Sequence, residues 1–119
     1  IVVTYDVTTN RCGIGVWSIT GGATTTPTET DASAGSGTSM SITIDGQPGG
    51  VVIACLANYH TTLRTTTWDT LTENYDAATE TPVNHSGASL NLTTYVSSFT
   101  CNISATTTER ALVSALWNP

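Results

Sequence analysis

The stretch Gly49-Gly50-Val51-Val52-Ile53-Ala54-Cys55-Leu56-Ala57-Asn58 decides the fold that we predict for this chain. It holds the longest unbroken apolar run in the sequence, yet it is far shorter than the about 20 residues that cross a bilayer. β-Branched residues open the run after two glycines, which favours a strand over a buried helix. A strand that is apolar at every position has both faces covered. We therefore expect residues 50–57 to form a central strand that the rest of the chain covers.

The composition points to an all-β protein. The 119 residues suit one domain, which we take as residues 1–119. Charged residues make up 10% of the chain, against roughly 25% in ordinary globular domains. Thr is the most frequent residue, and its branched Cβ suits the solvent face of a sheet better than a helix.

Apolar alternation and turn residues predict further strands at residues 1–7, 12–20, 39–44, 71–75, 85–92, 95–103 and 111–117. The last of these is apolar enough to be covered on both faces, like residues 50–57. Residues 21–38 are expected to form a long loop, Asp69-Thr70 a turn, and residues 76–84 and 105–110 connections. We expect an antiparallel β-sandwich, jelly-roll-like, with about eight strands. A closed barrel is the alternative, but it would not need strands that are apolar on both faces.

The charge balance argues against two classes of partner. The net charge is −6, with three Arg and no Lys. Nucleic acid binding needs a basic surface, and an anionic membrane surface attracts basic segments, so neither partner is expected. Lys is also the residue that most often protects exposed sheet edges. Its absence suggests that loops or other subunits cover the edges here.

Cys12, Cys55 and Cys101 have no CxxC spacing, so we expect neither a metal site nor a disulfide framework. Buried free thiols are the simplest interpretation, and a Cys55–Cys101 bridge between two sheets is the alternative in an oxidising compartment. The chain opens at Ile1 without Met and without a signal pattern. We therefore expect a processed product or part of a longer chain.

The sequence shows no catalytic constellation. His60 and His85 lack a neighbouring activated nucleophile, so we predict no catalytic residue, no enzyme activity and no cofactor. Four acids gather within a short stretch: Asp69, Glu73, Asp76 and Glu80. We expect these to be solvated loop acids. A Ca²⁺ site and a glycosidase pair of Glu73 with Asp76 or Glu80 are the alternatives.

Aromatic residues supply the candidate ligand-binding positions. Trp17 and Trp117 fall within expected strands and are assigned to the core. Trp68 lies at a loop edge with Tyr59 and Tyr75 nearby in sequence, which suggests a platform on which a sugar ring could stack. Packing of Trp68 at the rim of the core is the competing interpretation.

Several segments together resemble small β-rich structural proteins of tailed bacteriophages and prophages. They are residues 13–17 with Thr20-Gly21, residues 49–54, residues 67–76, Glu80, residues 85–89 and residues 111–117. These are strand and turn signatures that span nearly the whole chain. The resemblance implies a β-sandwich virion protein without an active site.

That resemblance and the acidic, Thr-rich composition lead us to expect a capsid decoration (cement) protein. It would be located in the virion, assembled in the host bacterial cytoplasm, and would contact the major capsid protein or other virion proteins. We expect a homo-oligomer, and specifically a trimer. The expected contact elements are the strand at residues 1–7, with Ile1, Val3 and Tyr5, and the loop at residues 21–38, with Pro27. The alternative is a carbohydrate-binding or receptor-binding module of a phage tail or fibre.

Overall fold

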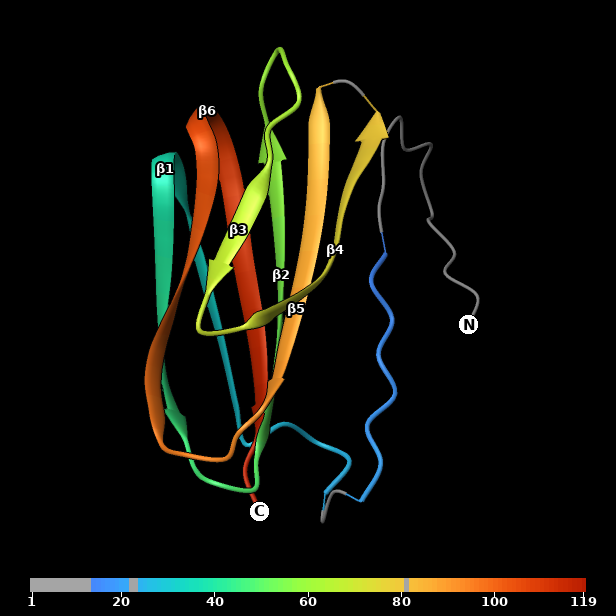
Figure 1. Ribbon diagram of the computed structural model, residues 1–119, viewed down its shortest axis with the longest axis vertical. Helices are drawn as coiled ribbons and strands as arrows, with labels where there is room; N and C mark the ends of the chain where they lie inside the picture. Colours follow the sequence, from blue (N-terminus) through green and yellow to red (C-terminus); the bar gives the residue numbers. More distant parts are fainter. Residues whose placement is uncertain (1–13, 22–23, 81) are drawn as a thin grey trace.

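A computed structural model describes residues 14–21, 24–80 and 82–119 of the chain (Figure 1). Within these residues six strands form one antiparallel sheet, with no helix and hence none that could span a membrane. The strands are β1 (Glu29–Gly46), β2 (Val51–Tyr59), β3 (Thr66–Asp69), β4 (Thr72–Glu80), β5 (Val83–Asn91) and β6 (Val96–Trp117). Their order is β1-β6-β2-β5-β4, with β3 paired to β6. The all-β antiparallel class is confirmed.

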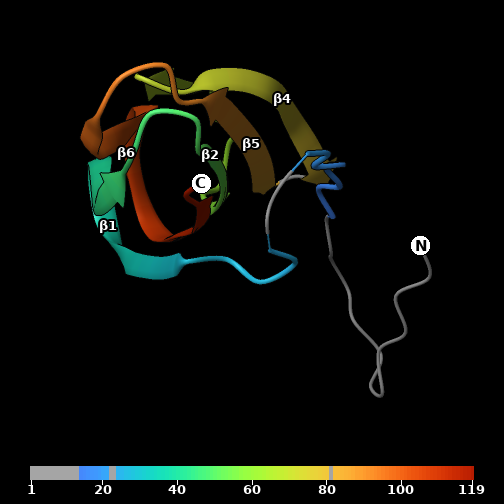
Figure 2. The ribbon, with the colours of Figure 1, turned by 90° about the horizontal axis from the view of Figure 1, so that it is seen from below.

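Two long strands, β1 and β6, make the sheet turn back on itself. The second half of β1 pairs with the first half of β6, where Met40 lies opposite Cys101. The first half of β1 pairs with the second half of β6, where Ala34 lies opposite Ala111. β3 pairs with the first half of β6 and β2 with the second half. The sheet therefore curves around a single interior, as the view in Figure 2 shows.

The core fills that interior with alternate residues from four strands, β1, β2, β5 and β6, and from the turns beside them. Leu56, Leu112 and Phe99 are among its largest buried side chains. The complete apolar cluster is Met40, Ile42, Ile44, Val52, Ala54, Leu56, Leu71, Ala88, Leu92, Phe99, Cys101, Ile103, Leu112 and Leu116. Each large apolar side chain buried in this way stabilises the fold by roughly 1.5–3 kcal/mol relative to leaving it exposed.

The stretch at residues 50–57 does form a strand, β2, which lies between β6 and β5. The expectation that both of its faces are fully covered is wrong. Val52 and Leu56 are buried on the inner face, whereas Ile53 and Cys55 on the outer face are only half-buried. The same holds for residues 111–117, because Val113 is 48% exposed. No second layer of sheet covers the outer face of these strands in the described part of the chain.

The count of about eight strands is also wrong, because regions expected to be loops continue the strands. Residues 29–38 belong to β1, so the expected loop at residues 21–38 ends before Glu29. Residues 105–110 join two expected strands into the single strand β6. These polar stretches pair with each other, since Gly35 lies opposite Arg110. A separate-sheet sandwich or jelly roll is not confirmed, since one hydrogen-bonded sheet contains all six strands.

The remaining strand expectations divide into two groups. Residues 72–75 and 85–91 of the expected strands fall in β4 and β5, and the chain turns at Asp69-Thr70 as predicted, where Thr70 has a φ of 77°. Residues 76–84 are mostly strand rather than connection, because β4 and β5 pair up to Glu80 and Val83. Residues 14–20 of the expected strand 12–20 form no strand. The expected strand at residues 1–7 lies outside the described residues.

Candidate functional site

The outer face of β6, β2, β5 and β4 is apolar and carries small side chains. Pairing places Val113, Cys55, Gly87 and Tyr75 in one row across these strands. The next row holds Ala111, Ala57, His85 and Ala77. Neither row carries a charged carboxylate or a cationic Arg, although the chain has a net charge of −6. An exposed and contiguous apolar surface of this kind is typical of an interaction site.

Residues 14–21, which we call the covering segment, lie across part of this face. Trp17 anchors the segment, because its Nε1 donates to Asn74 Oδ1 over 2.9 Å and its ring centroid lies 5.9 Å from that of Tyr75. Gly87 lies beneath both rings, where a Cβ would be 2.7 Å from Trp17 Cη2. Ile14 and Val16 of the segment are 52% and 60% exposed. The segment thus covers apolar surface and presents new apolar surface of its own.

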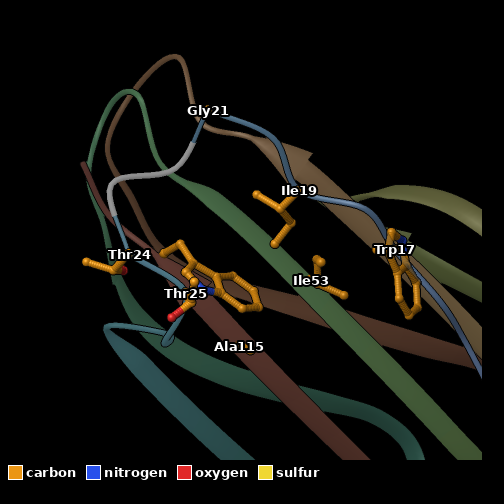
Figure 3. Close-up of a pocket in the computed structure, with 8 residues that line it drawn as sticks. Trp17, Ile19, Gly21, Thr24, Thr25, Ile53 and Ala115 are labelled. Carbon is orange, nitrogen blue, oxygen red and sulfur yellow. The ribbon is translucent and has the colours of Figure 1, made fainter. Parts of the chain in front are cut away.

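A shallow cavity of about 530 Å³ lies between the covering segment and the sheet (Figure 3). Ile19 and Trp17 line it from the segment, and Ile53 lines it from β2. The full lining is Trp17, Ile19, Gly21, Thr24, Thr25, Ile53, Ala115 and Trp117. Two indole rings and two Thr hydroxyl groups at one cavity give it both apolar and hydrogen-bonding surface.

Tyr75 joins Cys55 and His85 into a small hydrogen-bonded group on the outer face. The Tyr75 hydroxyl lies 3.1 Å from His85 Nδ1, and the rings are 5.3 Å apart. Burial raises the pKa of the Cys55 thiol, although a hydrogen bond from Tyr75 opposes that rise. Burial also raises the pKa of Tyr75 and lowers the pKa of His85. All three groups are therefore held neutral at pH 7.

The neutral state of Cys55, Tyr75 and His85 limits the chemistry that these side chains can perform. A cysteine nucleophile reacts as the thiolate, and the shift at Cys55 works against thiolate formation. The other described thiol, Cys101, is buried, and its pKa is raised to about 12, mainly by burial. Among the described residues, no three His, Cys, Asp or Glu side chains are grouped to hold a metal ion. The arrangement suits packing and recognition better than bond-breaking chemistry.

The structure does not bring together the three residues expected to bind a ligand. Trp68 packs towards the core, with its ring centroid 6.3 Å from Phe99, and its Nε1 donates to Ser86 Oγ over 2.8 Å. Tyr75 lies under Trp17 on the outer face. Tyr59, 41% exposed, lies on the same face at the end of β2. Trp68 is therefore separated from both tyrosines by the sheet.

The clustered acids have different environments. Asp76 is half-buried, and its Oδ2 accepts from the backbone N–H of Thr66 over 2.8 Å. Its Oδ1 accepts from Asn84 Nδ2 over 2.5 Å. Glu73 and Asp69 are exposed, and burial together with the charge of Asp76 raises the pKa of Glu73. The hydrogen bonds of Asp76 connect β4 to β3 and β5, which is a role in the fold.

The expected contact residues and cysteines are placed only in part. Ile1, Val3 and Tyr5 lie outside the described residues, as does Cys12. Pro27 is half-buried directly before β1. Cys55 and Cys101 are both free thiols, so the alternative of a bridge between them is wrong. Cys55 faces outward from β2 and Cys101 faces the core, which explains why they do not meet.

Sequence reasoning missed Trp17 and Trp117 as surface residues, because both were assigned to the core. Trp117 is paired with Val51, one position beyond the buried Leu116, so the period of two places it on the outer face. That alternation was available in the sequence. The position of Trp17 was not, since it depends on the packing of the covering segment against Gly87.

Comparison with known proteins adds no relative. Neither models of protein families, nor curated protein sequences, nor solved structures match this chain. The resemblance to phage structural proteins therefore stays a prediction.

Proposed function

We propose that this chain is a structural protein of a bacteriophage virion, and specifically a capsid decoration (cement) protein. The observation that carries the proposal is the outer face around Val113, Ala111 and Ala57, which is apolar, uncharged and exposed in an acidic chain. Such a face gains free energy when another surface covers it, at about 25 cal/mol per Å² of apolar area. The chain would thus act by burying surface between subunits of the head.

Further parts of the proposal follow from the same role. The partners would be the major capsid protein or other virion proteins, and the chain itself would form an oligomer, with a trimer as the first expectation. Assembly would take place in the host bacterial cytoplasm. For the architecture, we infer a compact variant of the β-sandwich, because the two halves of β6 contribute Phe99 and Leu112 to one core.

The test compares virions assembled with and without this protein. We expect the protein to co-sediment with the heads, and heads that lack it to release DNA at a lower temperature. Val113→Glu should weaken co-sedimentation because it places a charge in the outer face, while Thr43→Glu, on an exposed position of β1, should not. Absence of the protein from purified heads, with unchanged heat resistance, would show that it is not a cement protein.

A carbohydrate-binding or receptor-binding module is the second candidate, and the cavity between Trp17 and Trp117 favours it. Indole rings stack on the apolar faces of sugar rings, and Thr24 and Thr25 supply hydroxyl groups beside them. A glycan array separates the candidates. Saturable binding that is lost in Trp117→Ala, and kept in Trp68→Phe, would favour the binding module over the cement protein.

A further inference from the structure

The inner face of the sheet changes from apolar to polar at one row of residues. Leu56 and Leu112 lie opposite each other, and both are fully buried. Two positions further along these strands, Asn58 of β2 lies between Asn84 of β5 and Arg110 of β6. Because alternate residues share a face, this polar row points into the same interior as the two leucines.

Arg110 has an unusual set of partners. Its Nη2 donates to the backbone oxygen of Ser36 over 2.7 Å and to the backbone oxygen of Ser39. These carbonyl groups lie where the register between β1 and β6 shifts, on either side of Gly37. No carboxylate pairs with Arg110 among the described residues, although the chain has nine acids. Main-chain oxygens, rather than a carboxylate, thus hold the guanidinium group of the partly buried Arg110.

Three buried donors of the row have no acceptor in the described structure. They are Nδ2 of Asn58, whose side chain is 3% exposed, and Nε and Nη1 of Arg110. A buried donor without a partner destabilises the fold, and it does so more strongly when it belongs to a charged group. The nearest acceptors already take part in other hydrogen bonds, since both oxygens of Asp76 and the carbonyls of Ser36 and Ser39 each accept one.

We propose that Asn58 and Arg110 bind a small monovalent anion of about the size of chloride between β2 and β6. Cβ atoms of directly opposed residues lie about 4.5–5.5 Å apart, so one ion can receive hydrogen bonds from both side chains. An anion accepts from all three donors and balances the charge of Arg110. A water molecule would accept from only two of them and would leave the charge of Arg110 unbalanced.

The experiment follows the midpoint of thermal unfolding as sodium chloride replaces sodium gluconate at constant ionic strength. A ligand that binds only the folded state lowers the unfolding equilibrium constant by about tenfold for each tenfold increase above its Kd. We expect the midpoint to rise with chloride in the unmodified protein. It should also rise in Ser98→Glu, which changes the net charge by the same amount as Arg110→Met but at an exposed position of β6.

Two variants remove the site in different ways. Arg110→Met should lose the chloride dependence, and Asn58→Asp should lose it while remaining folded, because its carboxylate takes the place of the ion beside Arg110. The second variant keeps the test decisive if the first does not fold. Equal midpoints in chloride and gluconate for the unmodified protein, or an unchanged chloride dependence in Asn58→Asp, would overturn the proposal.

Crystals grown in sodium bromide give an independent readout. An anomalous peak within hydrogen-bond distance of Asn58 Nδ2 and Arg110 Nε would support the anion. Density without an anomalous signal at that position would mean that water satisfies these donors, and would overturn it.

Discussion

Trp17 of the covering segment lies directly over Gly87 of β5, and Tyr75 lies beside it. A Cβ placed on Gly87 would be 2.7 Å from Trp17 Cη2 and 2.5 Å from Tyr75 Cε1, closer than real Cβ contacts come. Both neighbours are aromatic rings that pack at 5.9 Å from each other. A residue without a side chain at this position is therefore what allows the covering segment to lie on the sheet.

The first prediction is that Gly87→Ala displaces the covering segment. Overpacking of a well-packed site typically costs about 1–3 kcal/mol, and we expect the free energy of unfolding to fall by that amount. Urea unfolding followed by tryptophan fluorescence measures the loss and reports the changed surroundings of Trp17. Gly35→Ala is the matched control, because a Cβ at Gly35 meets nothing within 4 Å. Equal effects of the two substitutions would contradict the packing described here.

The sequence was most informative where apolar residues alternate or run together. β2 was predicted because residues 51–57 are all apolar and so cannot form a surface segment. The turn at Asp69-Thr70 was predicted from its turn residues. The first half of β1 was not predicted. Its residues, such as Ser33 and Gly35, carry no apolar alternation, and their strand conformation comes from pairing with β6.

The site was less predictable than the fold, because it also depends on how the strands pair. The outer face consists of Ala, Gly, Val and Cys side chains whose grouping depends on the register of four strands. An apolar run such as residues 51–57 reads equally well as a strand covered on both faces or on one. The exposure of Val113 in the structure separates the two interpretations.

The second prediction concerns access to Cys55. Cys55 lies in the row of Gly87 and Tyr75, next to the site where Trp17 packs. Burial raises the pKa of its thiol, so alkylation by iodoacetamide should be slow at pH 7. In a Cys12→Ser background, Trp17→Ala should speed the labelling of Cys55 several-fold. Cys101, buried in the core with a pKa of about 12, should stay unlabelled in both proteins, and its labelling would indicate unfolding instead.

The third prediction concerns the hydrogen bond of the covering segment. Trp17→Phe keeps an aromatic ring over Gly87 but removes the donor to Asn74 Oδ1. Because the bond is exposed, its loss should cost at most about 1 kcal/mol, less than Trp17→Ala costs. Asn74→Ala should cost the same as Trp17→Phe, and the double variant should cost no more than either. Additive losses in denaturant unfolding would mean that the two residues do not interact.

The fourth prediction is a loss of stability in mild acid. Burial lowers the pKa of His85 from its ordinary value of 6.5, so the unfolded chain binds a proton there before the folded protein does. The contribution of His85 is therefore present above pH 6.5 and is lost as the pH falls towards its folded pKa. The free energy of unfolding should change by a fraction of about 1.4 kcal/mol per pH unit, since water still reaches the ring of His85. His85→Gln should make the urea midpoint less dependent on pH over this range, and an unchanged dependence would contradict the prediction.

The fifth prediction tests whether Asp76 serves the fold. Its carboxylate accepts from the N–H of Thr66 and from Asn84 Nδ2, and both partners are buried, at 1% and 4% exposure. Asp76→Ala leaves the N–H of Thr66 without a partner and leaves Asn84 Nδ2 with only a long bond of 3.4 Å to Thr66 Oγ1, so we expect the free energy of unfolding to fall by roughly 3 kcal/mol. Asp76→Asn keeps an acceptor oxygen and should cost less. Asp69→Ala, at an exposed position, should change stability by no more than about 0.5 kcal/mol. A folded and equally stable Asp76→Ala protein would instead leave this carboxylate free for a role in binding or catalysis.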